Sequence, residues 1–222
     1  ECHHVTLTGG EPLLRADLPI LLDALRERNS QVTIISNGHL LTEQTAISLL
    51  EHGVALFELP LLSHQREVHD RLSAAPGAWD SVLAAMTHVR LHHGQVVTAF
   101  VATRLNIGHL YETIKLAFAF GARAIMFNRF NPGGRGRTHL HELLPTVEQV
   151  RDAARVLLIC GPEYATSPVD SGVAWDLQFM EEDLKRPGVE LRKFIPVGFA
   201  AYAQNKQNIP LFIQGANYFN LG

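Results

Sequence analysis

The sequence predicts an α/β fold in which a parallel sheet is covered by helices and curls into a (β/α) barrel. Three observations support this fold. The hydrophobic period switches repeatedly between two residues and 3.6 residues, as it does when strands alternate with helices. The predicted strands are nearly continuously apolar, which is typical of parallel strands buried on both faces. Polar residues and glycines follow each strand, at the edge where a barrel carries its active site. An open doubly wound sheet would carry polar residues only at its switch point.

Five strand–helix units follow one another in the first two thirds of the chain. Thr42 is suited to cap a helix that Gly53 ends. Residues 64–77 are polar and predict a connection, and no clear period continues beyond about residue 159. The expected strands are residues 4–8, 31–36, 54–61, 95–103 and 123–127. The expected helices are residues 17–28, 42–51, 78–92, 109–120 and 145–158.

Composition excludes several classes of protein. Hydrophobic residues make up 46% of the 222 residues and charged residues 18%, so a packed globular protein is expected. A formal net charge of −3 argues against non-specific nucleic-acid binding, and no apolar run is long enough to span a membrane. Only two cysteines occur, Cys2 and Cys160, which excludes a disulfide framework and predicts a cytoplasmic location. Because there is no initiator methionine, the chain is expected to be the interior of a longer protein.

A glycine pair and an acid follow the first predicted strand, in the order Gly9, Gly10, Glu11 and Pro12. Glycines let a backbone approach a ligand closely, and a neighbouring carboxylate can accept charge-assisted hydrogen bonds from an ammonium group. Pro12 is suited to the start of a helix. A tight turn with an acidic residue is the simpler interpretation of these four residues alone.

Further motifs follow in a fixed order. They are "ISNG", then "VHDRL" with "PGAWDSVLAAM", then "VATRLNIGHLYE", and finally "MFNRFNPGGRG". Together with "LTGGEPLLR", this ordered set resembles the radical SAM enzymes over about two thirds of the chain. It looks closest to the SPASM-type branch, whose members often modify peptides. One element departs from the family, because "ELPLLSHQ" stands where a Ser-Leu-Asp triplet is usual. Either Glu58 or Ser63 is therefore expected to take that polar role.

The resemblance implies a cofactor site for S-adenosylmethionine at the strand ends. Gly9, Gly10 and Glu11 correspond to the residues that hold the methionyl ammonium, with Pro12 beside them. The other implied cofactor-binding residues are Ser36 and Asn37 near the same end of the ligand, Thr103 and Asn106 near the ribose or carboxylate, and Asn128 and Arg129 near the adenine. In "VHDRL", Asp70 and Arg71 are expected to anchor a loop rather than to act in catalysis.

The family also uses a [4Fe–4S] cluster held by a Cys-x3-Cys-x2-Cys loop, and thiolates are the ligands of such clusters. Neither Cys2 nor Cys160 has a second cysteine at this spacing, so no metal ligand is assigned in this chain. The cluster ligands are expected upstream. The chain thus predicts a partial, TIM-barrel-like core in residues 1–158 that starts at the second strand. Residues 159–222 would be an irregular C-terminal extension, interpreted as a degraded auxiliary-cluster region.

The resemblance implies an oxidoreductase-like enzyme that, with its cluster, generates a 5′-deoxyadenosyl radical and modifies a substrate, interpreted as a peptide. A flavodoxin or ferredoxin is the expected electron donor, and this chain without the upstream loop is expected to be inactive. The alternative is a cluster-free barrel scaffold that binds a peptide or small molecule. An aldolase-like barrel would need a catalytic lysine at a strand end, and these strand ends hold none. A loop metal site at His139, His141 and Glu142 is disfavoured against a solvated helix.

Overall fold

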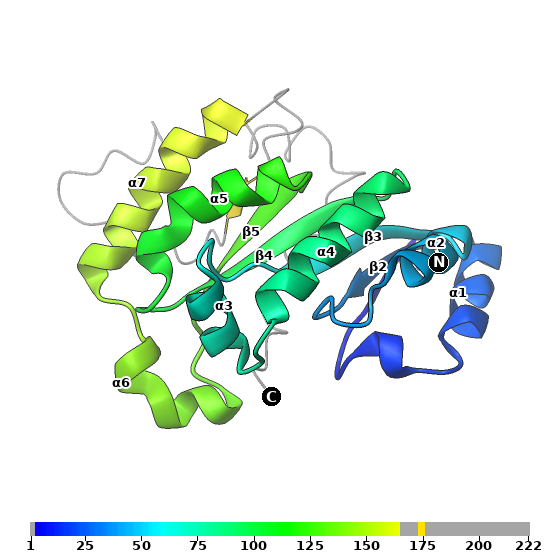
Figure 1. Cartoon of the computed structure of the whole chain (residues 1–222), viewed down its shortest axis with the longest axis horizontal. Coiled ribbons are helices and arrows are strands. Elements are labelled where there is room, and N and C mark those ends of the chain that lie inside the picture. The colour runs from blue at the N-terminus through cyan, green and yellow to red at the C-terminus, as the bar shows by residue number, and fades with distance from the viewer. Residues whose placement is uncertain (1–2, 165–172, 176–222) are drawn as a thin grey trace.

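The computed structural model describes residues 3–164 and 173–175, which form a parallel sheet covered by helices (Figure 1). The six strands pair in sequence order, each parallel to the next. They are β1 (His4–Leu7), β2 (Gln31–Ile35), β3 (Val54–Pro60), β4 (Val96–Ala102), β5 (Ala124–Arg129) and β6 (Val173–Trp175). The helices are α1 (Leu18–Glu27), α2 (Glu43–Glu51), α3 (Arg66–Ser73), α4 (Ala78–Leu91), α5 (Leu110–Ala119), α6 (Leu140–Leu143) and α7 (Val147–Tyr164), with 3-10 turns η1 (Pro12–Leu14), η2 (Ile107–His109) and η3 (Gly134–His139). This arrangement confirms the predicted parallel α/β architecture.

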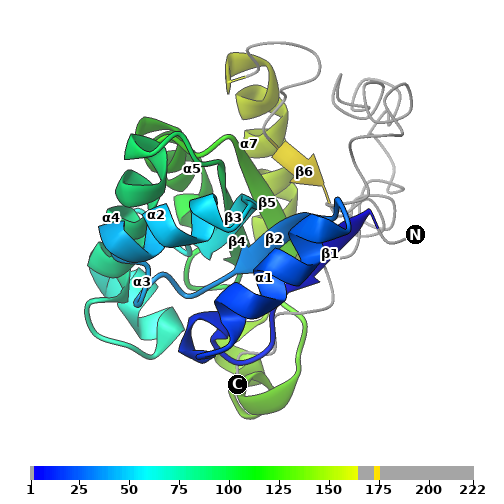
Figure 2. The same cartoon turned by 90° about the vertical axis from the view of Figure 1, so that its right-hand side faces the viewer.

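The main hydrophobic core lies between the sheet and its helices. Figure 2 shows α2, α4 and α5 on one side of the strands. Ile34, Phe57 and Phe100 project from three neighbouring strands into this core, where each is fully buried. Residues one position away along the same strands project to the opposite face, because side chains alternate across a strand. That opposite face, which we call the inner face, includes Leu56, Val97, Ala124 and Met126, and these four side chains pack together.

The structure confirms all five predicted strands and most of the helix boundaries. The hydroxyl oxygen of Thr42 accepts a 3.2 Å hydrogen bond from the backbone N–H of Thr45, so Thr42 caps α2 as expected. The prediction of a plain connection over residues 64–77 is wrong, because α3 forms inside it. Of the eight residues of α3 only His69 is buried, so the segment shows hardly any apolar stripe.

The end of the predicted core also needs correction. Helix α7 continues to Tyr164, past the boundary expected after residue 158. Strand β6 follows and pairs with β5 in the same sheet, so the sheet extends into the predicted C-terminal extension. The division into two domains stays a prediction, and residues 176–222 lie outside the described part of the chain. No helix within that described part has an apolar stretch long enough to cross a bilayer.

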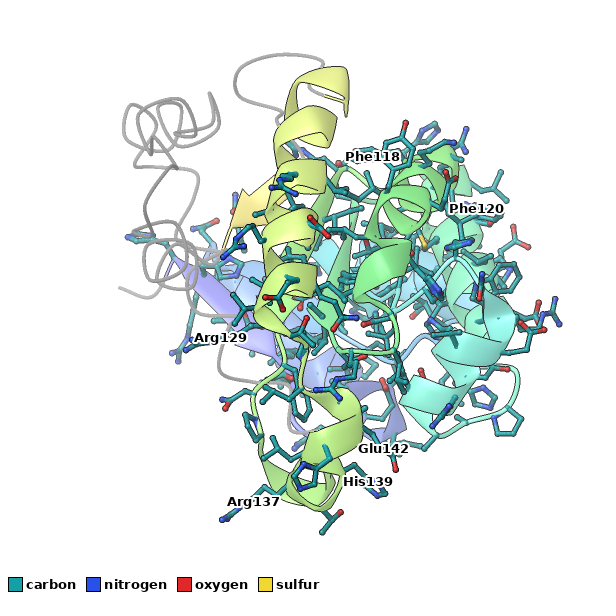
Figure 3. The ribbon with its side chains drawn as sticks, turned by 90° about the vertical axis from the view of Figure 1, so that its left-hand side faces the viewer. Phe118, Phe120, Arg129, Arg137, His139 and Glu142 are labelled. Atoms are coloured by element: carbon teal, nitrogen blue, oxygen red, sulfur yellow. The ribbon has the colours of Figure 1, made fainter. Side chains whose placement is uncertain are left out.

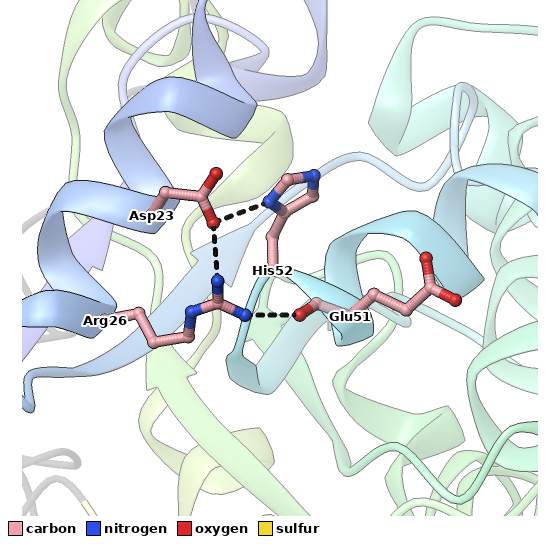
Figure 4. Close-up of polar contacts among 4 residues, drawn as sticks. All are labelled: Asp23, Arg26, Glu51 and His52. Atoms are coloured by element: carbon pink, nitrogen blue, oxygen red, sulfur yellow. Dashed lines mark hydrogen bonds and ion pairs between the residues drawn. The ribbon is translucent and has the colours of Figure 1, made fainter.

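Arginine side chains join neighbouring strand–helix units at the edge of the sheet where the strands begin. Arg26 of α1 donates a 3.0 Å hydrogen bond to the carbonyl oxygen of Glu51, the last residue of α2 (Figure 4). Asp23 holds this arrangement by accepting from Arg26 at 3.2 Å and from His52 at 2.9 Å. Similarly, Arg90 of α4 donates to the carbonyl oxygen of the last residue of α5, at 3.4 Å. The last carbonyl groups of a helix have no partner within the helix, and a cationic side chain can donate hydrogen bonds to them. These contacts therefore stabilise the pairs α1–α2 and α4–α5.

Candidate functional site at the carboxyl ends of the strands

The predicted cofactor residues gather at the edge of the sheet where the strands end. Gly9 to Pro12 follow β1, and Ser36 with Asn37 follows β2. Thr103 begins the loop after β4, while Asn128 and Arg129 are the last two residues of β5. Parallel strands end at the same edge, so three loops and the end of β5 lie along it.

Two exposed glycines leave open space after β1. Gly9 has a φ of +132°, a conformation that favours glycine over residues with a side chain. A Cβ atom added to Gly9 or to Gly10 would find no atom within 4 Å. The backbone at this turn is therefore accessible to a ligand.

The carboxylate of Glu11 connects the loop after β1 to the loop after β2. Its Oε1 atom accepts hydrogen bonds from the backbone N–H of Leu13 at 3.2 Å and from the hydroxyl of Ser36 at 2.9 Å. Its Oε2 atom accepts from the backbone N–H of Asn37 at 2.8 Å. A carboxylate has about four acceptor positions. The group is thus held in one orientation and keeps capacity for a further donor.

Ser36 and Asn37 shape the second loop around that carboxylate. The buried hydroxyl of Ser36 also accepts a 3.1 Å hydrogen bond from the backbone N–H of Gly38. The exposed side chain of Asn37 accepts from the backbone N–H of His39 at 2.8 Å. Both residues therefore support the turn through local contacts, and Asn37 also stands at the surface of the candidate site.

Asn106 is fully buried, and its side chain holds the loop after β4 together. Its Oδ1 atom accepts from the backbone N–H of Thr103 at 2.6 Å and from the hydroxyl of Thr103 at 2.8 Å. Its amide group donates to the carbonyl oxygens of Leu62 at 2.7 Å and Val101 at 2.9 Å. Both amide hydrogens are used within the protein, so a hydrogen bond from Asn106 to a ligand would require one of these contacts to break. The sequence pointed to Asn106 but could not show that its amide hydrogens are already bonded within the protein.

Asn128 and Arg129 project to opposite faces at the end of β5. The side chain of Asn128 is 8% exposed on the inner face, and its Nδ2 atom has no hydrogen-bond partner among the described residues. A buried donor without a partner carries a free-energy cost, so it points to a ligand. Arg129 is exposed, and Figure 3 shows it well apart from Arg137, His139 and Glu142 on the η3–α6 segment.

The two residues expected to take the polar role after β3, Glu58 and Ser63, differ in their contacts. The hydroxyl of Ser63 is engaged at 2.9 Å with His109 Nδ1 and at 3.0 Å with the backbone N–H of Gln65. Glu58 instead lies on the inner face with 5% of its surface exposed, and its Oε1 atom lacks a partner in the described chain. Burial raises the pKa of Glu58 to about 7. Of the two residues, Glu58 is therefore the one whose side chain has a buried oxygen without a hydrogen-bond donor in the described chain.

The "VHDRL" element anchors a loop, as expected. Asp70 accepts hydrogen bonds from the backbone N–H groups of Gly77 at 2.7 Å and Trp79 at 2.8 Å, and these bonds lower its pKa. The buried ring of His69 accepts at Nδ1 from the backbone N–H of Leu62 at 3.1 Å. Burial lowers the pKa of His69 to about 4, so the ring is neutral near pH 7. Arg71 forms an exposed 3.5 Å ion pair with Glu142.

The described residues include no group of three or more histidine, cysteine, aspartate or glutamate side chains arranged to hold a metal ion. The cysteines of the whole sequence, Cys2 and Cys160, are too few to supply the three thiolates of a Cys-x3-Cys-x2-Cys loop. The residues present therefore do not fit an iron–sulfur cluster. The open glycine turn, the oriented Glu11 carboxylate and the unpartnered Asn128 amide do fit a polar organic cofactor.

Two relatives of known function match about three quarters of the chain. The chain is 29% identical over 161 residues to the PqqA peptide cyclase of Rhizobium meliloti (strain 1021), covering 72% of this chain and 43% of that protein. It is 28% identical over 164 residues to the mycofactocin maturase MftC of Mycolicibacterium smegmatis (strain ATCC 700084 / mc(2)155), covering 73% of this chain and 41% of that protein. The chain thus spans less than half the length of these relatives.

Solved structures share the fold. Streptococcus suis SuiB superimposes with a TM-score of 0.64 at 16% identity, covering 86% of this chain and 44% of SuiB. Coproporphyrinogen III oxidase (HemN) from Escherichia coli gives a TM-score of 0.59 at 14% identity, with 72% of this chain and 40% of HemN covered. These likenesses confirm the predicted partial (β/α) barrel. A family model described as the radical SAM superfamily matches residues 1–117, more than half of the 222 residues. The chain therefore belongs to the radical SAM superfamily.

Proposed function

We propose that this chain is the S-adenosylmethionine-binding part of a radical SAM enzyme that modifies a peptide. Family membership supports the cofactor, because the superfamily uses S-adenosylmethionine with a [4Fe–4S] cluster. One relative supports a peptide substrate, since it is a PqqA peptide cyclase, and the structural neighbour SuiB has been solved with its precursor peptide SuiA. The SPASM-type branch is our finer assignment. The observation that carries the proposal is the Glu11 carboxylate, which is held beside an accessible glycine turn.

Each residue of the edge has a distinct proposed role. Glu11 receives the methionyl ammonium, because three hydrogen bonds already orient its carboxylate and leave it capacity for a charged donor. Gly9 and Gly10 admit the ligand against the backbone. Asn128 offers its unpartnered amide to an acceptor of the adenine or its surroundings. Asn106 positions the loop after β4, where the hydroxyl of Thr103 lies.

Several parts of this proposal concern the whole protein. In the whole protein, S-adenosylmethionine held by Glu11 and the glycine turn would, together with a reduced cluster, supply the chemistry that removes a hydrogen atom from the substrate. The cluster ligands belong upstream of this chain, and a flavodoxin or ferredoxin would deliver the electron. A cytoplasmic location, where thiols stay reduced, suits such a cluster.

Two substitutions in the full-length protein test the cofactor site. Glu11→Ala should weaken S-adenosylmethionine binding by roughly 1.5–3 kcal/mol, the scale of a hydrogen bond to a charged group, as measured by titration calorimetry. Gly10→Ala should weaken binding about tenfold, because the new methyl group enters the space of the ligand without meeting protein atoms. Gly108→Ala also meets no atom within 4 Å and is the matched control, expected to bind normally. Unchanged affinity in both test variants would show that the loop is only a turn.

A third measurement tests the enzymatic reaction. The full-length protein, reconstituted anaerobically with iron and sulfide, should release 5′-deoxyadenosine from S-adenosylmethionine when reduced. No release from protein with a spectroscopically verified cluster would exclude the radical reaction. It would favour instead the cluster-free scaffold that binds a peptide or small molecule.

A further inference from the structure

His109 is the meeting point of two hydroxyl groups that lie outside the proposed cofactor residues. Its ring atom Nδ1 lies 2.9 Å from the hydroxyl oxygen of Ser63, in the loop after β3. Its backbone carbonyl oxygen accepts a 2.8 Å hydrogen bond from the hydroxyl of Thr113 on α5. The same Thr113 hydroxyl accepts from the backbone N–H of His64 at 2.9 Å. His109 thus joins the loop after β3 to η2 and α5 through both its side chain and its backbone.

The hydrogen positions at Ser63 determine the protonation state of His109. Ser63 is fully buried, and its hydroxyl oxygen already accepts a 3.0 Å hydrogen bond from the backbone N–H of Gln65. Among the described residues, His109 Nδ1 is the one acceptor within reach of the Ser63 hydroxyl hydrogen. A buried donor without an acceptor is costly, so Ser63 donates and His109 Nδ1 accepts. The ring is therefore neutral, with its proton on Nε2.

The loop that Ser63 anchors is also bonded to the loop after β4. The carbonyl oxygen of Leu62, one residue before Ser63, accepts from the side-chain amide of Asn106 at 2.7 Å. Asn106 in turn orients the backbone N–H and the hydroxyl of Thr103 through its Oδ1 atom. A displacement of Ser63 would therefore reach Thr103 through two consecutive hydrogen-bonded contacts.

A positive charge on His109 would break this arrangement. Protonation puts a hydrogen on Nδ1 and leaves the buried Ser63 hydroxyl without its acceptor. The ring of His64 lies edge-on to that of His109, with 5.2 Å between the ring centres and 73° between the ring planes, so a charge on one ring opposes a charge on the other. Burial and, after it, the charge of His64 lower the pKa of His109.

Helices α5 and α7 also pack against η2, which carries His109. The titratable side chains on residues 110–119 of α5 and 147–157 of α7 are Tyr111, Glu112, Lys115, Glu148, Arg151, Asp152 and Arg155. None of them contributes to the pKa shift of His109, in which His64 is the one charged group of the described chain that acts on the ring. The loop after β3 is therefore the element to which the charge of His109 is coupled.

We propose that His109 is a positioning residue for S-adenosylmethionine: its neutral ring holds the loop after β3 against η2 and so keeps Thr103 in place to contact the cofactor. Protonation of the ring releases the loop and weakens cofactor binding. This inference rests on the proposed function, because Thr103 is one of the proposed cofactor contacts.

Nuclear magnetic resonance of the His109 ring tests the inference with a readout other than activity. The full-length protein is labelled with ¹⁵N-histidine, and the His109 signals are identified by their absence in His109→Asn. Near neutral pH the ¹⁵N shifts should place the proton on Nε2. Saturating S-adenosylmethionine should lower the pKa of His109 by about one unit, because the cofactor favours the neutral ring. A proton on Nδ1, or a pKa that the cofactor leaves unchanged, would overturn the inference.

The pH dependence of cofactor binding, measured by calorimetry, provides the second readout. Asparagine keeps an acceptor near the position of Nδ1 but does not titrate, so His109→Asn should bind the cofactor like the wild type at neutral pH. Between about pH 7.5 and about pH 5.5, the affinity of the wild type should fall about threefold more than that of His109→Asn, while other titrating groups act alike in both. His109→Ala, which offers no acceptor, should bind about tenfold more weakly at neutral pH.

The matched control is His93→Asn, at an exposed histidine after α4, which should keep the pH profile of the wild type. Equal profiles in the wild type and His109→Asn, or normal binding by His109→Ala, would overturn the role of His109 alone. A wild type that binds no S-adenosylmethionine at any pH would contradict the proposed function, and this role with it.

Discussion

The hydroxyl of Ser36 donates a 2.9 Å hydrogen bond to the carboxylate of Glu11 and so joins two loops that are 25 residues apart in the sequence. The same hydroxyl accepts from the backbone N–H of Gly38, so one buried oxygen serves both the turn and the acid. The orientation of the carboxylate therefore depends on the second strand as much as on its own loop.

Removing this hydroxyl should have a measurable cost. Ser36→Ala is expected to lower the free energy of unfolding by about 1–2 kcal/mol, because it leaves a buried N–H and one carboxylate oxygen with fewer partners. It should also weaken S-adenosylmethionine binding, since Glu11 gains freedom. Urea unfolding and calorimetry measure the two effects. The control is Ser48→Ala in α2, whose effect should be less than half as large, and equal effects would contradict the structural role of Ser36.

Asn106 should behave as a structural residue. Asn106→Ala removes four buried hydrogen bonds and leaves the carbonyl oxygens of Leu62 and Val101 without donors. We expect a loss of about 3 kcal/mol in the free energy of unfolding, measured with urea. Asn131→Ala, at an exposed position of the next loop, is the control and should change it little. If Asn106→Ala unfolds like the wild type but binds the cofactor more weakly, Asn106 is a ligand contact instead.

Two buried groups should give the stability opposite dependences on pH. Burial raises the pKa of Glu58 from the ordinary 4.5 to about 7. Its contribution to the free energy of unfolding is therefore fully present below pH 4.5 and is lost as the pH rises through 7. His69 has a pKa lowered to about 4, below the ordinary 6.5, so its contribution is present above pH 6.5 and is lost as pH falls through 4. Each of these two contributions to the free energy of unfolding amounts to about 3 kcal/mol, and the pH ranges over which they change nearly coincide.

Glu58→Gln should therefore expose the effect of His69. The free energy of unfolding of this variant should rise by about 3 kcal/mol more than that of the wild type between pH 4.5 and 7. Urea unfolding of both proteins across this range measures the difference, in which other carboxyl groups cancel. Parallel curves for the two proteins would show that Glu58 titrates as an ordinary carboxyl group.

The hydrophobic period sufficed to predict the parallel sheet, and the predicted cofactor residues, taken from the family resemblance, gather at the carboxyl ends of its strands. Thr42 shows why local features were predictable, since its cap depends on neighbours three residues away. Helix α3 was not predictable in this way, because its packing buries one histidine and not an apolar stripe. Strand β6 has three residues and depends on its pairing with β5, which is a contact distant in sequence.

The candidate site shows the same limit. Glu11 was predictable because its acid stands in a motif with the glycines. Glu58 and Ser63 could not be separated from the letters "ELPLLSHQ" alone, because the choice depends on strand register and on the contact between Ser63 and His109. The occupied amide of Asn106 likewise depends on Leu62, which is 44 residues away. Which atoms still have bonding capacity is a property of the packed structure.

The arginine contacts at the opposite edge of the sheet bear on how the chain folds. Arg26 and Arg90 each reach the last carbonyl of the next packed helix, within 29 residues along the chain. Such contacts close short loops and form early at small entropic cost. We expect the pairs α1–α2 and α4–α5 to assemble as separate folding units during synthesis, before the loops of the candidate site come together at the other edge. The order of assembly would thus run from the edge where the strands begin toward the edge that carries the candidate site.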